Sequence, residues 1–134
     1  MTTLQPPDWP RPKGYANGIL AEGRLLFVAG QIGWDADERL ADGLAAQTEQ
    51  ALRNILAVLR EGGAGPEHVA RMTWYVTDKH AYNAALAEIG QVYRTVIGPR
   101  YPAMTLVEVA DLLEPGALVE IEATAVVPYA QKQT

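Results

Sequence analysis

The sequence predicts a two-layer α+β sandwich in which two helices cover one face of a mixed sheet. Several short segments alternate apolar and polar residues, which is typical of strands, and two longer ones repeat apolar residues every three or four positions, which is typical of amphipathic helices. These segments follow one another in the order ββαβαββ. We expect one domain over residues 1–134, with an extended, proline-rich arm at 1–13 and a loose tail at 129–134.

The first two strands are expected at residues 18–21 and 24–32, joined by a tight turn at Glu22-Gly23. The run at 25–29 is apolar on both sides, as in a strand that is covered on both faces. Gly30 and Gly33 flank Gln31 where this strand ends. Glycines at such a position let the backbone turn or let a ligand approach closely, and the sequence leaves both interpretations open.

Two helices and a strand fill the middle of the chain. The first helix is expected from residue 43 to about residue 61, and Gly62-Gly63 gives it a C-terminal stop signal. A strand at 69–77 and a second helix at 81–96 follow, and Gly98-Pro99 ends that helix.

The last two strands are expected within residues 101–127, joined by a polar turn at 114–116. Glu108, Glu120 and Glu122 stand on their faces with no Lys or Arg inside either strand to pair them. Carboxylates at such positions need water or a chemical role. Because the helices cover one face, we expect the other to carry Met104, Leu106, Trp74 or their neighbours together with Glu108 and Glu120, and to bind a partner in a closed homo-oligomer.

Composition excludes several classes of function. Eleven Lys and Arg against 16 Asp and Glu give a net charge of −5, the wrong sign for a nucleic-acid-binding protein without a basic cluster. The chain has no Cys for a disulfide or a thiol nucleophile and no Ser for a serine nucleophile. His68 and His80 are expected at the surface, so we expect no metal site. No apolar run is long enough to span a membrane and no signal peptide is evident, so a soluble, cytoplasmic protein is expected.

Several motifs resemble the RidA family, also called YjgF or reactive-intermediate deaminases. They are GYANGI, LFVAGQIG, VTD, YPAMTLVEVADL and VEIEATAV, and the similarity spans residues 14–127. The resemblance implies a chorismate-mutase-like fold and a homotrimer whose sheets close an inner barrel, with clefts between the subunits. It also implies hydrolysis of enamines and imines to carbonyl compounds and ammonia, without a cofactor.

The resemblance also implies the site residues. Tyr15 matches the cleft tyrosine, Ala29-Gly30-Gln31 the strand end whose backbone lines the cleft, and Glu120 the glutamate that holds or activates water. Ala29 stands where relatives carry Ser or Thr.

Met104 departs from the family pattern. Relatives that act on 2-imino acids carry an arginine there, which grips the substrate carboxylate, and a thioether cannot do so. Arg100 is the nearby cation that the sequence offers as a substitute.

Two functions therefore remain open. One is a deaminase acting on imines or enamines other than ordinary 2-imino acids. The other is a non-catalytic trimer that binds a small metabolite or a regulatory partner in the same cleft. A ribonuclease, an activity claimed for some relatives, fits poorly with the acidic charge and the absence of a catalytic histidine pair.

Overall fold

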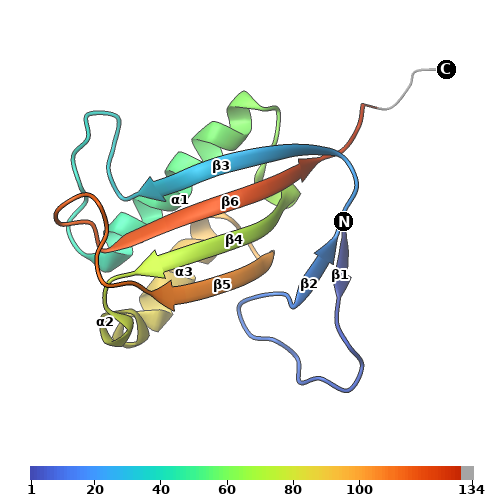
Figure 1. Ribbon diagram of the computed structural model, residues 1–134, viewed down its shortest axis with the longest axis horizontal. Helices are drawn as coiled ribbons and strands as arrows, with labels where there is room; N and C mark the ends of the chain where they lie inside the picture. Colours follow the sequence, from blue (N-terminus) through green and yellow to red (C-terminus); the bar gives the residue numbers. More distant parts are fainter. Residues whose placement is uncertain (131–134) are drawn as a thin grey trace.

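A four-stranded sheet with helices on one face forms the body of the molecule, as the computed structural model of residues 1–130 shows (Figure 1). The strands are β3 (Arg24–Ile32), β6 (Val119–Val127), β4 (Val69–Val76) and β5 (Ala103–Glu108), and they lie in that order across the sheet. β6 is antiparallel to β3 and β4, whereas β4 and β5 run parallel. The predicted mixed α+β sheet is therefore confirmed.

The helices lie together behind the sheet in Figure 1. They are α1 (Leu44–Glu61), α2 (Lys79–Ala84) and α3 (Leu86–Val96), with a 3₁₀ turn, η1, at Pro66–His68. α1 ends at Gly62 as predicted. The second predicted helix is divided at Ala85, whose backbone caps α2 and precedes α3.

Strand neighbours differ from the prediction at both ends of the chain. β2 (Gly18–Leu20) does not pair with β3. It pairs with β1 (Thr2–Leu4), so the N-terminal arm forms a separate two-stranded ribbon. β5 and β6 are consecutive in sequence but do not form a hairpin, because β4 lies between them. The tail expected at 129–134 lies outside the described residues from 131 onward.

One hydrophobic core fills the space between helices and sheet. α1 contributes side chains with no exposed area, and β4 and β6 contribute alternate residues. The core includes Leu52, Ile55, Leu59, Met72, Trp74, Val76, Val119, Ile121 and Ala123.

The prediction for the uncovered face was wrong for four of the residues that it named, Trp74, Met104, Leu106 and Glu108. Trp74 is buried in the core and Met104 and Leu106 pack against it, so all three lie on the helix side of the sheet. Glu108 shares their side, since strand alternation fixes its direction, and its Oε1 accepts a hydrogen bond from the Lys79 N–H at 2.9 Å. The predicted alternation of side chains along the strands is correct, but the sequence did not show which set of side chains faces the helices.

The uncovered face carries the neighbours of those residues. β4 and β5 contribute polar side chains, and β6 contributes the half-buried carboxylates of Glu120 and Glu122. Leu25, Phe27 and Val107 are exposed hydrophobic residues on the same face, and Phe27 is 72% exposed. No helix among residues 1–130 is long and apolar enough to cross a membrane.

Candidate functional site

Tyr15 and Met104 meet at the edge of the sheet formed by β5. They line a cavity of about 290 Å³ together with Lys13, Gly14, Tyr82 and Leu106. The preceding loop is held against β5 because the Ala16 N–H donates to the Pro102 carbonyl at 2.9 Å and Ala16 bridges to Ala103. The backbone thus places the Tyr15 side chain, which is 42% exposed, beside residue 104.

Glu120 lies at a different place, beside the irregular end of β3. It lines a cavity of about 260 Å³ that Gly30 and Gln31 also line, with Ile32, Trp34, Leu113 and Glu114. The pairing of β3 with β6 shifts register between Val28 and Gln31. Such a bulge takes backbone out of the ladder, which here leaves Gly30 next to the carboxylate. A Cβ on Gly30 would lie 2.8 Å from the Glu120 Cδ.

The geometry at Gly30 shows a third possibility beside a turn or the approach of a ligand. The neighbour that comes close is a side chain of the same protein, Glu120. The Gln31 amide folds back on the strand end, with Nε2 donating to the Ala29 carbonyl at 3.0 Å. The bulge in β3 therefore provides the space in which the Glu120 side chain lies.

The residues predicted from the resemblance form two groups within one chain. The Tyr15 and Met104 group lies at the β5 edge, and the Glu120 group lies where β3 and β6 pair, with β4 between β6 and β5. None of the described cavities contains members of both groups. Within one chain, Tyr15 and Glu120 therefore line separate cavities.

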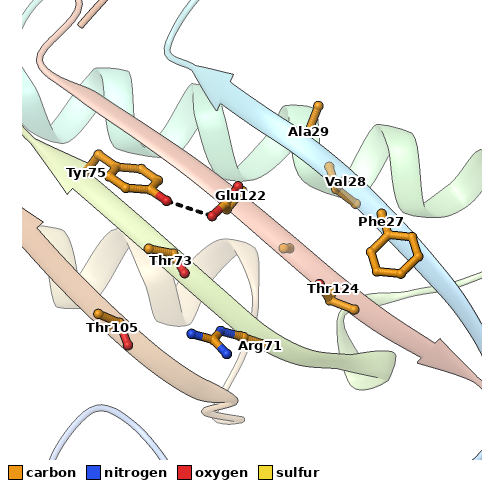
Figure 2. Close-up of a pocket in the computed structure, with 10 residues that line it drawn as sticks. Phe27, Val28, Ala29, Arg71, Thr73, Tyr75, Thr105, Glu122 and Thr124 are labelled. Atoms are coloured by element: carbon orange, nitrogen blue, oxygen red, sulfur yellow. Dashed lines mark hydrogen bonds between the residues drawn. The ribbon is translucent and has the colours of Figure 1, made fainter.

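The uncovered face holds a further cavity of about 550 Å³, with both apolar and polar residues in its lining (Figure 2). Its lining includes Ala29 and the side chains of Phe27, Arg71, Thr73, Tyr75, Thr105, Glu122 and Thr124. The Tyr75 hydroxyl donates to Glu122 Oε1 at 2.7 Å. This hydrogen bond raises the pKa of Tyr75 above its ordinary value, and burial and the negative charges of Glu122 and Glu120 raise it further.

Arg100 is the cation that the sequence offered as a substitute for the family arginine. It is exposed, lines none of the described cavities, and its carbonyl accepts a hydrogen bond from the Tyr93 hydroxyl at 2.7 Å. Two other cations lie nearer. Lys13 shares a cavity with Tyr15 and Met104, and Arg71 shares a smaller one of about 220 Å³ with the same two residues.

Sequence reasoning missed both of these cations. Arg71 is in register with Ala103, one residue before Met104, but only because β4 and β5 are parallel neighbours. In Figure 2 its side chain extends from β4 toward β5 and Thr105. No motif in the sequence predicts that β4 and β5 pair, so Arg71 could not be found from the sequence. Lys13 could have been found, because it lies two residues before Tyr15.

The two histidines lie away from these cavities. His68 belongs to η1, and its Nδ1 accepts a hydrogen bond from the Gly65 N–H at 3.0 Å. His80 is exposed on α2. Among residues 1–130 no cluster of three or more His, Cys, Asp or Glu side chains could hold a metal ion.

Comparison with known proteins gives a consistent family. The family model described as Endoribonuclease L-PSP matches residues 10–127. The RutC family protein slr0709 of Synechocystis is 36% identical over 131 residues, which cover 96% of this chain and 98% of the relative. Human 2-iminobutanoate/2-iminopropanoate deaminase is 28% identical over 114 residues, 84% of this chain and 79% of that protein.

Comparison with solved structures leads to the same family. The Rid-family protein YyfB of Yersinia pestis, described as of unknown function, has a TM-score of 0.82 at 35% identity and covers 94% of this chain and 98% of its own. RidA from an Antarctic Psychrobacter has a TM-score of 0.69 at 28% identity, with 95% and 100% coverage. The chain therefore belongs to the RidA/YjgF family, whose family model carries the description Endoribonuclease L-PSP.

Proposed function

We propose that the protein hydrolyses reactive imines and enamines to a carbonyl compound and ammonia, in a cleft between the subunits of a homotrimer. The observation that carries the proposal is the half-buried Glu120 carboxylate in a cavity beside the Gly30 backbone, at the position that the family resemblance assigns to the water-activating glutamate. Relatives named 2-iminobutanoate/2-iminopropanoate deaminase support the reaction class.

The chemistry needs one group that moves protons. Water adds to the imine carbon, a C–O bond forms, and the C=N π electrons pass to nitrogen, which takes up a proton. Glu120 carries that proton from water to nitrogen, which gives the carbinolamine. It then takes the proton of the new hydroxyl group and delivers it to the amine as the C=O bond forms and the C–N bond breaks, so that ammonia leaves. An enamine enters the same route after protonation at its β-carbon. Water, imine, ketone and ammonia balance without a redox cofactor.

Two observations support an assembly. Leu25, Phe27 and Val107 expose apolar surface on the uncovered sheet face, which a partner copy would cover. The Tyr15 and Glu120 groups are separate within one chain, so a cleft containing both requires the β5 edge of one copy to approach the β3 end of another. The resemblance to the RidA family implies a homotrimer, which agrees with this arrangement.

Met104 sets the expected substrate range. A bidentate arginine–carboxylate contact contributes charge-assisted hydrogen bonds of about 1.5–3 kcal/mol each, and the Met104 thioether offers none. We therefore expect small 2-imino acids to be poor substrates and imines without that carboxylate to be better ones.

The same residue motivates a second candidate function. A cleft that has lost its carboxylate clamp can bind a small metabolite without turning it over, so the trimer can act as a binding or regulatory protein. Ribonuclease activity is not proposed despite the family description, because the chain carries a net charge of −5 and its histidines line none of the described cavities.

A trapping assay separates these functions. An amine oxidase generates an uncharged imine, and semicarbazide captures whatever the protein does not hydrolyse first. The deaminase hypothesis expects less semicarbazone and faster ammonia release with the wild-type protein, and loss of both effects in Glu120→Ala. Glu122→Ala, on the same strand face, is the control for loss of a carboxylate. Equal rates for wild type and Glu120→Ala would remove the proposed chemistry. A ligand that raises the melting temperature but is not consumed would favour the binding function.

A further inference from the structure

A cavity of about 340 Å³ lies between α2, α3 and the helix side of β4 and β5. Its volume falls in the range of small-molecule binding sites. Four aromatic residues contribute to its wall: Trp74, Tyr82, Tyr93 and Tyr101. Leu86, Ile89 and Met104 add apolar contact, and Lys13 and Arg94 are exposed cations at its margin.

The aromatic wall is ordered by its own packing. Tyr93 and Tyr101 stack with ring centroids 5.2 Å apart and an interplanar angle of 7°. Trp74 lies 6.4 Å from Tyr93 at 41°. The Tyr93 hydroxyl is held by the Arg100 carbonyl, so its ring cannot swing away without losing that hydrogen bond. The wall is a preformed surface for a planar group.

Trp74 leaves one donor without a partner. The side chain is 2% exposed, and its Nε1–H has no hydrogen-bond acceptor among residues 1–130. A buried indole usually finds an acceptor, and an unsatisfied one is costly. The Nε1 atom itself has less than 1 Å² of accessible surface, so a ligand in the cavity meets the indole ring and not this donor.

The phenols present neutral faces to the cavity. Burial raises the pKa of Tyr82, and burial followed by the proximity of Tyr101 raises that of Tyr93. The cationic groups are at the margin, where neither Lys13 nor Arg94 forms an ion pair with a described residue. The site is therefore apolar inside and cationic at its mouth, which suits a ligand with a ring at one end and an anion at the other.

The cavity adjoins the candidate cleft. It shares Lys13, Gly14, Tyr82 and Met104 with the cavity that contains Tyr15. Lys13 lines the same cavity as Tyr15 and so offers a positive charge there, and a Met thioether packs favourably on aromatic rings. A group that reacts beside Tyr15 can thus extend a ring past Met104 into the aromatic wall.

We propose that this cavity binds the ring of an aromatic 2-imino acid, with Lys13 holding the carboxylate, so that the protein prefers aromatic over small aliphatic substrates. The proposal rests on the proposed deaminase function for the reaction, but not for binding. It is consistent with Met104, because the ring supplies binding free energy that a small imino acid without the arginine clamp does not have.

Binding of the stable ketone product tests the site without turnover. Isothermal titration calorimetry with phenylpyruvate and pyruvate should give a Kd at least tenfold lower for phenylpyruvate. Gly90→Leu fills the cavity from α3; the added Cβ would lie 3.3 Å from the flexible Arg94 Nη1, and leucine favours a helix interior over glycine, so the variant should fold. It should raise the phenylpyruvate Kd at least tenfold.

A lysine pair tests the anion contact. Lys13→Gln should raise the phenylpyruvate Kd at least fivefold, whereas Lys79→Gln, an exposed lysine that lines none of the described cavities, should leave it unchanged. Equal affinity for the two ketones, or phenylpyruvate binding that Gly90→Leu does not weaken, overturns the aromatic site.

Turnover separates this inference from the proposed function. Imines made by an L-amino-acid oxidase from phenylalanine and from alanine should differ at least tenfold in kcat/KM, and Gly90→Leu should reduce that ratio at least tenfold. Hydrolysis of both imines with equal efficiency would disprove the preference and leave the deaminase function intact. Tight phenylpyruvate binding with no hydrolysis of either imine would disprove the deaminase function and leave the aromatic binding site intact.

Discussion

Gly30 makes room for Glu120. A methyl group on the Gly30 Cα would lie 2.8 Å from Cδ and 3.0 Å from Cγ of Glu120, closer than carbon atoms can approach. The glycine therefore allows the carboxylate to lie against the bulge of β3.

Gly30→Ala should reduce imine hydrolysis at least tenfold while the fold persists. The contacting atoms are the far end of a flexible side chain, so Glu120 can rotate away, and its carboxylate then leaves the position needed to activate water. Steady-state rates and urea unfolding check the two parts separately. Gly65→Ala is the control, since its Cβ would lie 2.5 Å from Oε2 of Glu67 and so displaces a glutamate that lines none of the described cavities. Unchanged rates in Gly30→Ala would show that this contact does not position the carboxylate.

Met104→Arg should enlarge the substrate range toward small 2-imino acids. The guanidinium would stand beside Tyr15 in the cavity that both residues line, and a charge-assisted hydrogen bond of about 1.5–3 kcal/mol corresponds to at least tenfold in KM. The imine derived from alanine is the test substrate, and an uncharged imine is the comparison. Leu20→Arg is the control, since it adds an arginine at an exposed position that lines none of the described cavities. If Met104→Arg improved both substrates equally, the arginine would not be acting on the carboxylate.

The Tyr75–Glu122 hydrogen bond should make the protein sensitive to high pH. Because the hydrogen bond raises the Tyr75 pKa in the folded protein, its contribution to stability is present below the unfolded value of 10.0 and is lost as pH rises through the folded value. Glu122→Gln removes the negative charge and should lower the Tyr75 pKa. Tyrosinate ultraviolet absorbance, with Tyr75→Phe as the difference reference, follows this titration. A Tyr75 pKa that did not fall in Glu122→Gln would contradict the assigned cause.

Much of the fold could be predicted because local patterns determine it. The helix stop at Gly62 and the alternation in β6 depend on neighbouring residues, and both appear in the structure as predicted. The order of the strands in the sheet does not depend on residues that are adjacent in sequence. β4 lies between β5 and β6 although they follow one another in sequence, and β2 pairs with the arm, because pairing is decided by which faces the whole chain can bury.

The same limit applies to the candidate site. The family motifs pointed to Tyr15 and Glu120, but alternation alone could not say that Met104 faces the helix side. Arg71 reaches the Met104 cavity through a parallel pairing between residues 32 positions apart, since Arg71 is in register with Ala103. Arg100 looked suitable because it is close in sequence, but it lines none of the described cavities.

Gln47 should be the polar residue whose loss weakens the Glu120 end of the molecule most. Its side chain is 3% exposed; Nε2 donates to the Ala41 and Gly116 carbonyls at 3.2 and 3.1 Å, and Oε1 accepts from the Leu118 N–H at 2.8 Å. It thus ties α1 to the loops on either side of the cavity. Gln47→Ala leaves these backbone groups without their partner, which should lower the free energy of unfolding by about 3 kcal/mol. Urea denaturation measures this, and the exposed Gln91→Ala, whose hydrogen bonds stay within α3, should change it by less than about 0.5 kcal/mol. Similar midpoints for the two variants would mean that the three hydrogen bonds contribute no more than contacts with water.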